Sequence, residues 1–367
     1  GSYSGDGEGT KDKPFNKISD AIDASSSGDR IFIKKGNYHE KITIGRGIGL
    51  YGENRSKVFL SGGIEMGDDS LINNLTIEGG SKAISVDSDA DAEISGCTIK
   101  KFGKIGINAF SGSGKVVVKN SNIYGGTGKG IYIELGKRIE ISGNNIYNNG
   151  EEGIDVRAKA SGFIKNNNLH DNGESGIEII IGNSDVLISA NTIKKNGASG
   201  IAAQFYQETK KTGEINIKDN KIIENKKYGL DCALPSGGEP DSSYWDDSIN
   251  LAENNMENNG IKPINDFCNI IDAIDEFEEN IINKTNKNNL ESKKENMLED
   301  EILIDKEIEE DELIWENAEM ISKYQDTLEV KVNEQIDKIN AFGKIRIFFF
   351  GVNSDLLDFI KNEIEIN

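Results

Sequence analysis

The sequence predicts a parallel β-solenoid over roughly residues 1–260 and an α-helical region after it. The first observation is a repeat, because cutting the chain after a recurring glycine gives units of 23 to 31 residues: 84–106, 107–130, 131–153, 154–176, 177–200, 201–229 and 230–260. The second is the presence of 41 glycines against only 4 prolines, which favours one repeated kind of corner. The third is the loss of these corners after Gly260, where apolar residues recur at helical spacing.

Each unit contains three short segments that alternate in polarity and have the length of strands. Three apolar columns run down the aligned units and predict three sheets around one core: Ile99, Ile123, Ile146, Leu169, Ile193, Ile222 and Met256; Ile94, Val118, Ile141, Ile164, Ile188, Ile217 and Leu251; and Ile84, Ile107, Ile131, Ile154, Ile177, Ile201 and Leu230. Two polar columns predict stacked asparagine ladders: Asn144, Asn167, Asn191, Asn220 and Asn254; and Asn149, Asn172, Asn196, Asn225 and Asn259. Asn-Gly pairs would suggest hairpins, but the strict period brings identical positions into register one coil apart, so we expect parallel pairing.

The units resemble those of the right-handed parallel β-helix repeat proteins, the pectate-lyase-like superfamily, over roughly residues 5–260. The opening "GTKDKPFNKISDAIDASSSGDRIFIKKGNYHEKITI" is similar to the usual N-terminal cap and first coil of that family. The resemblance implies an all-β right-handed parallel β-helix (solenoid) with an N-terminal capping helix, which we place at about residues 14–25. Pro14 suits the first turn of this helix. An apolar stripe can cover the open end of the solenoid: Phe15, Ile18, Ala21 and Ile22.

Residues 261–342 are expected to form an α-helical, coiled-coil capping region. Apolar residues at 264, 267, 271, 274, 277 and 281 predict an amphipathic helix, and a polar linker follows at about 283–295. From Ile314 to Phe342 a heptad seam predicts either a hairpin with 264–282 or self-association through 261–367. Residues 343–367 are expected to form a tail of one short strand, in "KIRIFFFG", and one short helix.

One face of the predicted solenoid carries a candidate catalytic patch. Residues just after the start of each unit should point outward about 4.8 Å apart, as an exposed column: Ser85, Asn108, Tyr132, Asp155, Glu178, Ala202 and Asp231. Asp155 and Glu178 are then adjacent carboxylates, and repulsion between them gives an acid and a base. Arg157, beside Glu134 in a parallel column, can hold a uronate or orient the pair. The alternative is an ordinary solvated face with an Arg157–Glu134 ion pair that contributes little.

Aromatic residues near this patch are candidates for glycan binding, because aromatic faces beside carboxylates and amides suit sugar rings. Tyr132 lies in the column, and extra segments in the longer units, 206–213 and 234–247, bring the others close: Tyr206, Tyr244 and Trp245. The same segments fit an oligomer contact equally well. The acidic stretch 239–247 is a candidate calcium site, and no other metal or cofactor is expected.

The catalytic signatures of the resembled family are missing. Its pectate-lyase-like sites pair calcium-binding acids with a lysine or arginine base, its polygalacturonase-like sites use Asn-Thr-Asp, Asp-Asp and Gly-His-Gly, and its epimerase-like sites use Asp-Pro-His-Glu; none is present. Of the only two histidines, His39 is interpreted as structural and His170 as a surface residue and not a ligand. The three cysteines lack a CxxC spacing, so we expect neither a disulfide framework nor a zinc site, and we assign Cys97 and Cys232 to the core.

The composition of the chain limits the classes of partner that it can bind. Hydrophobic residues make up 36%, mean hydropathy is −0.50, and no apolar stretch approaches the roughly 18 residues that cross a bilayer, so no membrane span is expected. The net charge of −21 argues against nucleic acid and anionic membranes and favours neutral or cationic partners. The chain begins with Gly1 and Ser2, which fits a removed signal, a trimmed chain or neither.

The missing motifs lead us to expect a non-enzymatic protein, extracellular or at the cell surface, with a structural, adhesive or glycan-binding role and assembly through its C-terminal helices. The alternative is a polysaccharide-acting enzyme, a lyase, glycoside hydrolase or epimerase, on an acidic glycan. It would use Asp155, Glu178, Arg157 and Glu134, with the aromatic side chains as subsites. A third hypothesis is a trimeric spike or fibre, because parallel β-helices followed by coiled coils resemble phage and surface spikes.

Overall fold

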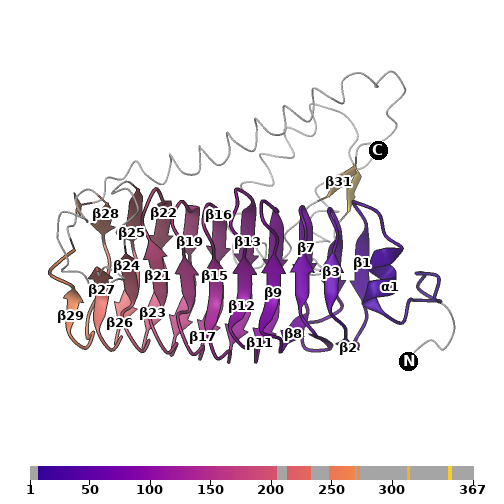
Figure 1. Ribbon diagram of the computed structural model, residues 1–367, viewed down its shortest axis with the longest axis horizontal. Helices are drawn as coiled ribbons and strands as arrows, with labels where there is room; N and C mark the ends of the chain where they lie inside the picture. Colours follow the sequence, from indigo (N-terminus) through magenta and orange to yellow (C-terminus); the bar gives the residue numbers. More distant parts are fainter. Residues whose placement is uncertain are drawn as a thin grey trace, which may run out of the picture. The chain divides into compact units, whose positions relative to one another are not determined.

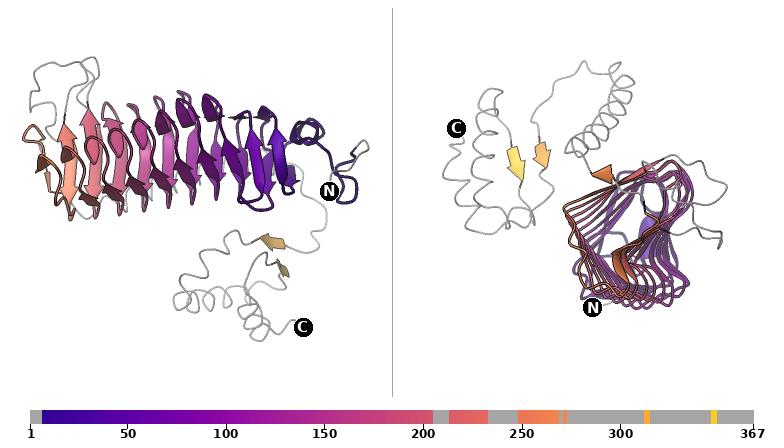
Figure 2. Two further views of the ribbon diagram at one scale, coloured as in Figure 1. Left: turned by 90° about the horizontal axis from the view of Figure 1, so that it is seen from below. Right: turned by 90° about the vertical axis from the view of Figure 1, so that its left-hand side faces the viewer.

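The computed structural model describes residues 7–204, 213–232 and 248–268, together with the backbone of short strands at 271–272, 312–314 and 346–348. The chain divides into two units, Gly1–Lys287 and Asn288–Asn367. In the described part of the first unit, a short helix and three parallel sheets form a right-handed solenoid (Figure 1). Its coils superimpose in the view along the solenoid axis (Figure 2). In the second unit, β31 (Glu312–Ile314) pairs in parallel with β32 (Arg346–Phe348).

Successive strands of the first unit alternate among three sheets, which we call sheets A, B and C. Sheet A contains β1 (Arg30–Ile33), β4 (Gly49–Gly52), β7 (Ser70–Asn73), β10 (Ala92–Ser95), β13 (Lys115–Lys119), β16 (Arg138–Ser142), β19 (Ser161–Lys165), β22 (Asp185–Ser189), β25 (Glu214–Lys218), β28 (Ile249–Ala252) and β30 (Ile271–Asp272). Sheet B contains β2 (Gly36–His39), β5 (Val58–Ser61), β8 (Thr76–Glu78), β11 (Thr98–Lys100), β14 (Asn122–Tyr124), β17 (Asn145–Tyr147), β20 (Asn168–His170), β23 (Thr192–Lys194) and β26 (Lys221–Ile223). Sheet C contains β3 (Ile42–Ile44), β6 (Ile64–Met66), β9 (Lys82–Val86), β12 (Ile105–Ala109), β15 (Lys129–Ile133), β18 (Ile154–Val156), β21 (Ile177–Ile180), β24 (Ile201–Gln204), β27 (Tyr228–Cys232) and β29 (Lys262–Ile264).

The strand register confirms the repeat alignment. Ile107 pairs with Ile131, and Ile131 pairs with Ile154, so equivalent positions of successive units lie side by side in parallel strands. Every member of the three apolar columns is buried except Leu251, which is half-buried in the last coil. The predicted parallel solenoid with one continuous core is therefore confirmed.

Both predicted asparagine ladders are present. Along each, the Nδ2 of one asparagine donates to the Oδ1 of the next at 2.9–3.0 Å, and that Oδ1 also accepts the first residue's backbone N–H. Each ladder thus satisfies the buried backbone groups of a corner. The glycine after the asparagine permits close stacking, because a Cβ at Gly173 would collide with the carbonyl oxygen of Gly150 on the preceding coil. The Asn-Gly pairs accordingly serve contact between coils and not hairpin turns.

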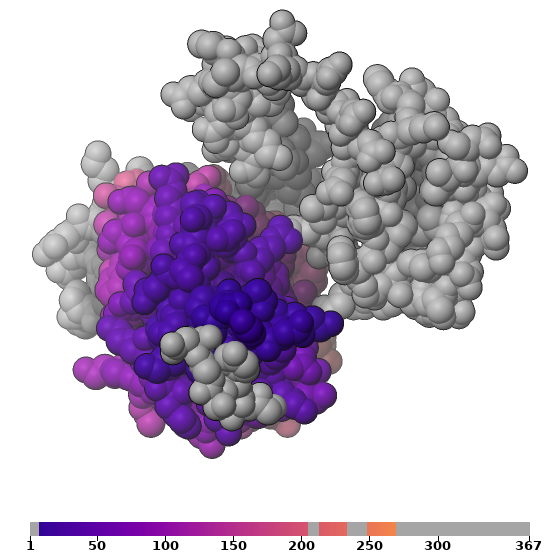
Figure 3. Space-filling view, turned by 90° about the vertical axis from the view of Figure 1, so that its right-hand side faces the viewer, coloured from indigo at the N-terminus to yellow at the C-terminus, as the bar shows by residue number. Residues whose placement is uncertain are grey.

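The N-terminal capping helix is shorter than predicted. Helix α1 spans Ile18–Asp23, and Pro14 lies before it. The helix begins at Ile18 because both oxygens of the Glu40 carboxylate accept hydrogen bonds from its first backbone amides, at 3.0 and 3.1 Å. Ile18 is buried and Ile22 packs against the core. Figure 3 looks onto this end of the solenoid, where the indigo N-terminal residues cover it.

The C-terminal end of the solenoid differs from the prediction of a helix beginning at Ile264. That residue instead ends β29 and pairs with Leu230, and β30 continues sheet A at 271–272. The open edges of sheets C and A offer backbone hydrogen-bond partners to this segment, and these partners outweigh its helical periodicity. The rest of the predicted helix, the linker at 283–295 and most of the heptad seam lie outside the described residues, as does the C-terminal helix. Self-association through 261–367 stays a prediction.

A disulfide joins the last coils. Cys232, at the end of β27, is bonded to Cys268, with 5.4 Å between their Cα atoms. The expectation that the cysteines form no disulfide is therefore wrong, because the chain winds once more around the solenoid and brings position 268 beside position 232. Cys97 is free and buried in the core, as predicted. No helix of the described residues is long and apolar enough to span a bilayer.

Candidate functional site

The predicted column on sheet C has the expected register. Tyr132 of β15 pairs with Asp155 of β18, and Asp155 pairs with Glu178 of β21. The column is not exposed along its length, however, because Asp155 and Asn108 are fully buried. The expectation of a solvated column is wrong at these positions, since long side chains from neighbouring coils fold over them.

Asp155 is held by two cations through one oxygen. Its Oδ2 lies 2.8 Å from the Nζ of Lys129 and 2.8 Å from Nη2 of Arg157. Its Oδ1 is buried and has no hydrogen-bond partner. Burial raises the pKa of Asp155, while the charges of Lys129 and Arg157 oppose that rise. The result is a buried carboxylate with one oxygen held by two cations and one oxygen without a hydrogen-bond partner.

Glu178 is the second carboxylate of the pair. Its Oε2 accepts a hydrogen bond from Nε2 of Gln204 at 3.0 Å, and its Oε1 lies 3.7 Å from Nη1 of Arg157. Burial and the negative charges of Asp155 and Glu152 raise the pKa of Glu178 to about 7, against the opposing charges of Arg157 and Lys129. Near neutral pH this side chain is therefore partly protonated, while the two cations beside Asp155 favour the anionic form of that carboxyl group.

A second carboxylate pair lies at the corner before these strands. Glu152 is buried, and its Oε2 lies 2.5 Å from Nζ of Lys129. A hydrogen bond with Glu152, followed by burial, raises the pKa of Glu174 to about 7. Burial would raise the pKa of Glu152, but hydrogen bonds from Glu174 and Lys129 hold it below its ordinary value. Glu174 is exposed, so water screens its interaction with Glu152 more than it screens the interactions of Glu178 with its neighbouring carboxylates.

The other predicted site residues are placed differently. The carboxylate of Glu134 accepts hydrogen bonds from the backbone and hydroxyl of Ser111 and from Asn108. Arg157 forms its ion pairs with two other carboxylates, Asp155 and Glu178. Two cations already lie over the Tyr132 ring, with the Arg157 guanidinium at 5.3 Å and the Lys129 ammonium at 5.9 Å from its centroid. The ring of Tyr132 therefore already makes cation–π contacts within the cluster in the absence of a sugar.

Three further candidates lie outside the described residues: Tyr206, Tyr244 and Trp245. The candidate calcium stretch at 239–247 lies there too. Conversely, four residues of the cluster were missed by sequence reasoning: Lys129, Glu152, Glu174 and Gln204. Gln204 stands in the column parallel to Asp155, which was a usable signal. Lys129 and Glu152 precede the apolar residue that opens their strands, where the column analysis did not look.

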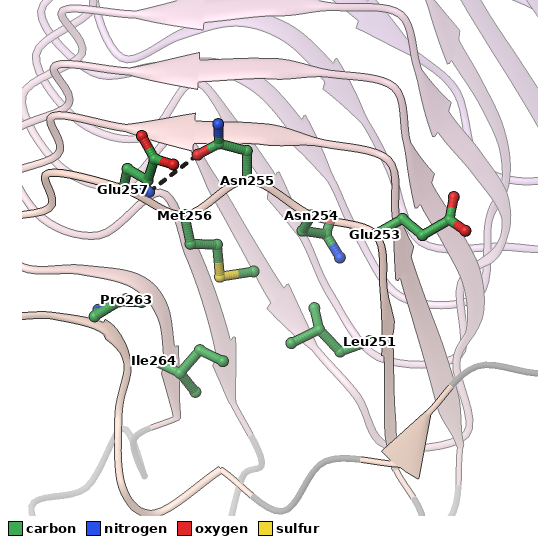
Figure 4. Close-up of a pocket in the computed structure, with 8 residues that line it drawn as sticks. All are labelled: Leu251, Glu253, Asn254, Asn255, Met256, Glu257, Pro263 and Ile264. Atoms are coloured by element: carbon green, nitrogen blue, oxygen red, sulfur yellow. Dashed lines mark hydrogen bonds between the residues drawn. The ribbon is translucent and has the colours of Figure 1, made fainter.

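A cavity of about 580 Å³ lies at the C-terminal end of the solenoid and not at this cluster. Figure 4 shows Leu251, Met256 and Ile264 around it. These are the inward-facing side chains of the last coil, so the cavity is the end of the core, and no cation faces its acidic side chains, Glu253 and Glu257, among the residues that line it. The polar cluster on sheet C is therefore the better candidate site.

Comparisons with known proteins place this fold. The model of the family "Right handed beta helix region" matches residues 62–208 and 109–295. A comparison with curated proteins found no match. Among solved structures, an alginate lyase from Paenibacillus sp. is 18% identical with a TM-score of 0.51, covering 68% of this chain and 96% of its own.

Two further solved structures are more distant. A thermostable α-1,3-glucanase catalytic unit from Streptomyces thermodiastaticus is 15% identical with a TM-score of 0.49, covering 64% of this chain and 55% of that one. The enzymatically active domain of tailspike protein 2 from bacteriophage CBA120 is 13% identical with a TM-score of 0.48, covering 65% of this chain and 38% of that one.

These findings overturn the expected non-enzymatic role. The expectation rested on the missing motifs of the resembled family, whereas the solved structure with a TM-score above 0.5 is named as an alginate lyase, and the sheet C face carries a buried charged cluster instead of an ordinary solvated surface. The family match spans more than half of the sequence, and the chain therefore belongs to the family of proteins with a right-handed β-helix region.

Proposed function

We propose that this protein is a polysaccharide-acting enzyme that cleaves glycosidic bonds on the sheet C face, with Glu178 as general acid and Asp155 as base or nucleophile. The observation that carries the proposal is the unequal environment of two carboxylates in register on adjacent coils. Asp155 is buried, with one oxygen held by two cations and the other without a hydrogen-bond partner, whereas Glu178 has a pKa of about 7. Environments that push two neighbouring carboxyl pKa values apart assign the acid and the base.

Hydrolysis is the reaction class that this pair supports best. Glu178 donates its proton to the leaving glycosidic oxygen. The unpartnered oxygen of Asp155 attacks the anomeric carbon or activates a water once the covering side chains of Lys129 and Arg157 move aside. Adjacent coils are about 4.8 Å apart, which fits the short carboxyl separation of hydrolases that retain the anomeric configuration. Gln204 orients the Glu178 carboxyl through its hydrogen bond.

A second candidate is β-elimination on an acidic glycan, and Arg157 is the observation that favours it. Its guanidinium bridges the two carboxylates and is partly exposed, so it can also meet the carboxylate of a uronate ring. In this reaction the unpartnered oxygen of Asp155, once uncovered in the same way, removes the proton next to the uronate carboxyl group, and Glu178 again protonates the leaving oxygen. The likeness in fold to an alginate lyase is compatible with this candidate.

We also propose that the protein works in an oxidising compartment, extracellular or periplasmic. Its support is the Cys232–Cys268 disulfide, because such bonds persist mainly outside the reducing cytosol. The proposed partner is a polysaccharide. A structural polysaccharide or a capsule would be reached in such a compartment.

The test is turnover of defined neutral and uronate-containing polysaccharides by the full chain, measured as new reducing ends and as ultraviolet absorbance of unsaturated ends. Hydrolysis gives reducing ends alone, whereas elimination gives both signals. We expect Glu178→Gln and Asp155→Asn to lose about 10²-fold or more in kcat. Glu93→Gln, which removes a partly exposed sheet A carboxylate paired with Lys119, is the matched control and should keep full activity. Activity that survives in both site variants would refute the assignment.

A further inference from the structure

Lys129 is the contact that joins the two carboxylate pairs. It begins β15, one coil before Asp155, and its Nζ lies 2.5 Å from Oε2 of Glu152 and 2.8 Å from Oδ2 of Asp155. The same Nζ lies 3.7 Å from Oε2 of Glu151. One ammonium group therefore touches both the corner pair, Glu152 and Glu174, and the strand pair, Asp155 and Glu178, through one member of each.

Arg157 does not duplicate this connection. Its ion pairs are with Asp155 and Glu178, both in the strand pair. The charge of Lys129 lowers the pKa of all four carboxyl groups, and the charge of Arg157 lowers the pKa of Asp155 and Glu178. Burial would lower the pKa of Lys129 itself, but Asp155 and Glu152 raise it above its ordinary value. The side chain therefore stays cationic over the pH range in which the carboxyl groups titrate.

We propose that Lys129 is a positioning residue that couples the two carboxylate pairs, because its ammonium group holds Glu152 of the corner pair and Asp155 of the strand pair at the same time. The role in catalysis rests on the proposed function, whereas the coupling itself does not. The charged and titratable groups that face Lys129 come from three successive coils: Tyr132 on its own strand; Glu151, Glu152, Asp155 and Arg157 on the next; and Glu174 and Glu178 on the third.

The coupling makes the corner pair part of the reaction cycle. When Glu178 gives its proton to a leaving group, negative charge increases next to Asp155 and Lys129. The ammonium can then move closer to the strand pair and away from Glu152, which makes the corner pair hold its own proton more tightly. A second carboxylic acid thus buffers the charge of the first through one side chain, without contact with the substrate.

The decisive experiment needs no substrate. Carboxyl groups of the full chain are labelled with ¹³C at Asp and Glu, and their titration midpoints are followed by NMR in the wild type, Lys129→Met and Lys129→Arg, with assignments from Glu152→Gln and Asp155→Asn. We expect Lys129→Met to raise the midpoints of Asp155 and Glu152 by about 1–3 pH units, the usual effect of losing one nearby opposite charge. Lys129→Arg should restore most of the wild-type values, because it keeps the charge, and Glu93 should titrate unchanged in all three proteins.

A Lys129 with a purely structural role gives a different result. The melting temperature of Lys129→Met would then fall while the midpoints of Asp155 and Glu152 stayed in place, and this outcome overturns the proposal. If Lys129→Met fails to fold, the same comparison is made with Lys129→Gln, which retains a polar stem of similar length. Movement of one pair alone also overturns the coupling.

Activity then separates this proposal from the proposed function. On a glycan that the wild type cleaves, the acidic limb of the pH profile of kcat/KM should shift to higher pH in Lys129→Met, by the same number of pH units as the Asp155 midpoint. Lys129→Arg should return it to nearly the wild-type pH. If the wild type cleaves no glycan, the proposed function fails while the NMR result still decides the coupling.

Discussion

Replacing Glu178 with glutamine should make the protein more stable at alkaline pH. The folded-state pKa of Glu178 is about 7 against an ordinary value of 4.5, so the folded chain retains a proton that the unfolded chain releases. The stability that this proton provides is complete below about pH 4.5 and is lost as the pH rises through about 7. With about 1.4 kcal/mol for each pH unit, the ionised side chain costs ~3 kcal/mol in the fold, which we discount to ~2 kcal/mol because the side chain is partly exposed.

Glutamine resembles the protonated acid and cannot ionise, so its variant escapes this cost. We expect Glu178→Gln to match the wild type within about 0.5 kcal/mol at pH 4.5 and to exceed it by ~2 kcal/mol at pH 8.5. In thermal unfolding followed by circular dichroism, that difference is a melting temperature higher by about 4–8 °C. Glu93→Gln serves as the control, because its partly exposed surface ion pair should contribute little. Parallel pH profiles of Glu178→Gln and the wild type would show that Glu178 is an ordinary surface acid and would refute the reasoning.

Three further predictions concern the scaffold. Asn172→Ala should cost ~3 kcal/mol in the free energy of unfolding by urea, because the carbonyl of Ile146 and the amide of Asn149 lose their partner; equal loss in the half-buried terminal Asn259→Ala would contradict the ladder argument. Reduction of the disulfide Cys232–Cys268 should speed hydrogen exchange in β27 and β29 and leave β9 and β12 unchanged; uniform exchange along the solenoid would show that the bond does not secure the last coils. Gly173→Ala should lower stability by ~1–3 kcal/mol, since its Cβ would strike the preceding coil, and an unchanged melting temperature would count against close stacking there.

The solenoid was largely predictable because its information repeats. Seven units place Ile131 and Ile154 in the same column, so one correct alignment fixes strand direction, register and core together. The helix expected from Ile264 failed because the next residues meet an existing sheet edge, a partner that periodicity does not describe. The Cys232–Cys268 bond escaped for a related reason, since its 36-residue separation exceeds every repeat and depends on the irregular last coil.

The site was predictable in position but not in environment. Alternation along a strand correctly places Asp155 and Glu178 on the outer face of sheet C, one coil apart. It does not tell which long side chains cover that face, so the burial of Asp155 under Lys129 and Arg157 had to come from the structure. Column analysis began at the first apolar residue of each unit and so excluded Lys129, whose side chain reaches across to the next coil.

The sheet C face also presents equivalent positions at a regular spacing along the solenoid axis. Every coil repeats the same outward positions with a rise of about 4.8 Å, so a polymer bound along the solenoid axis would meet equivalent side chains at regular intervals on both sides of Asp155 and Glu178. The preferred length of the bound polymer would then depend on how many coils flank the pair. Adding or deleting a whole coil would change that length without disturbing Asp155 and Glu178.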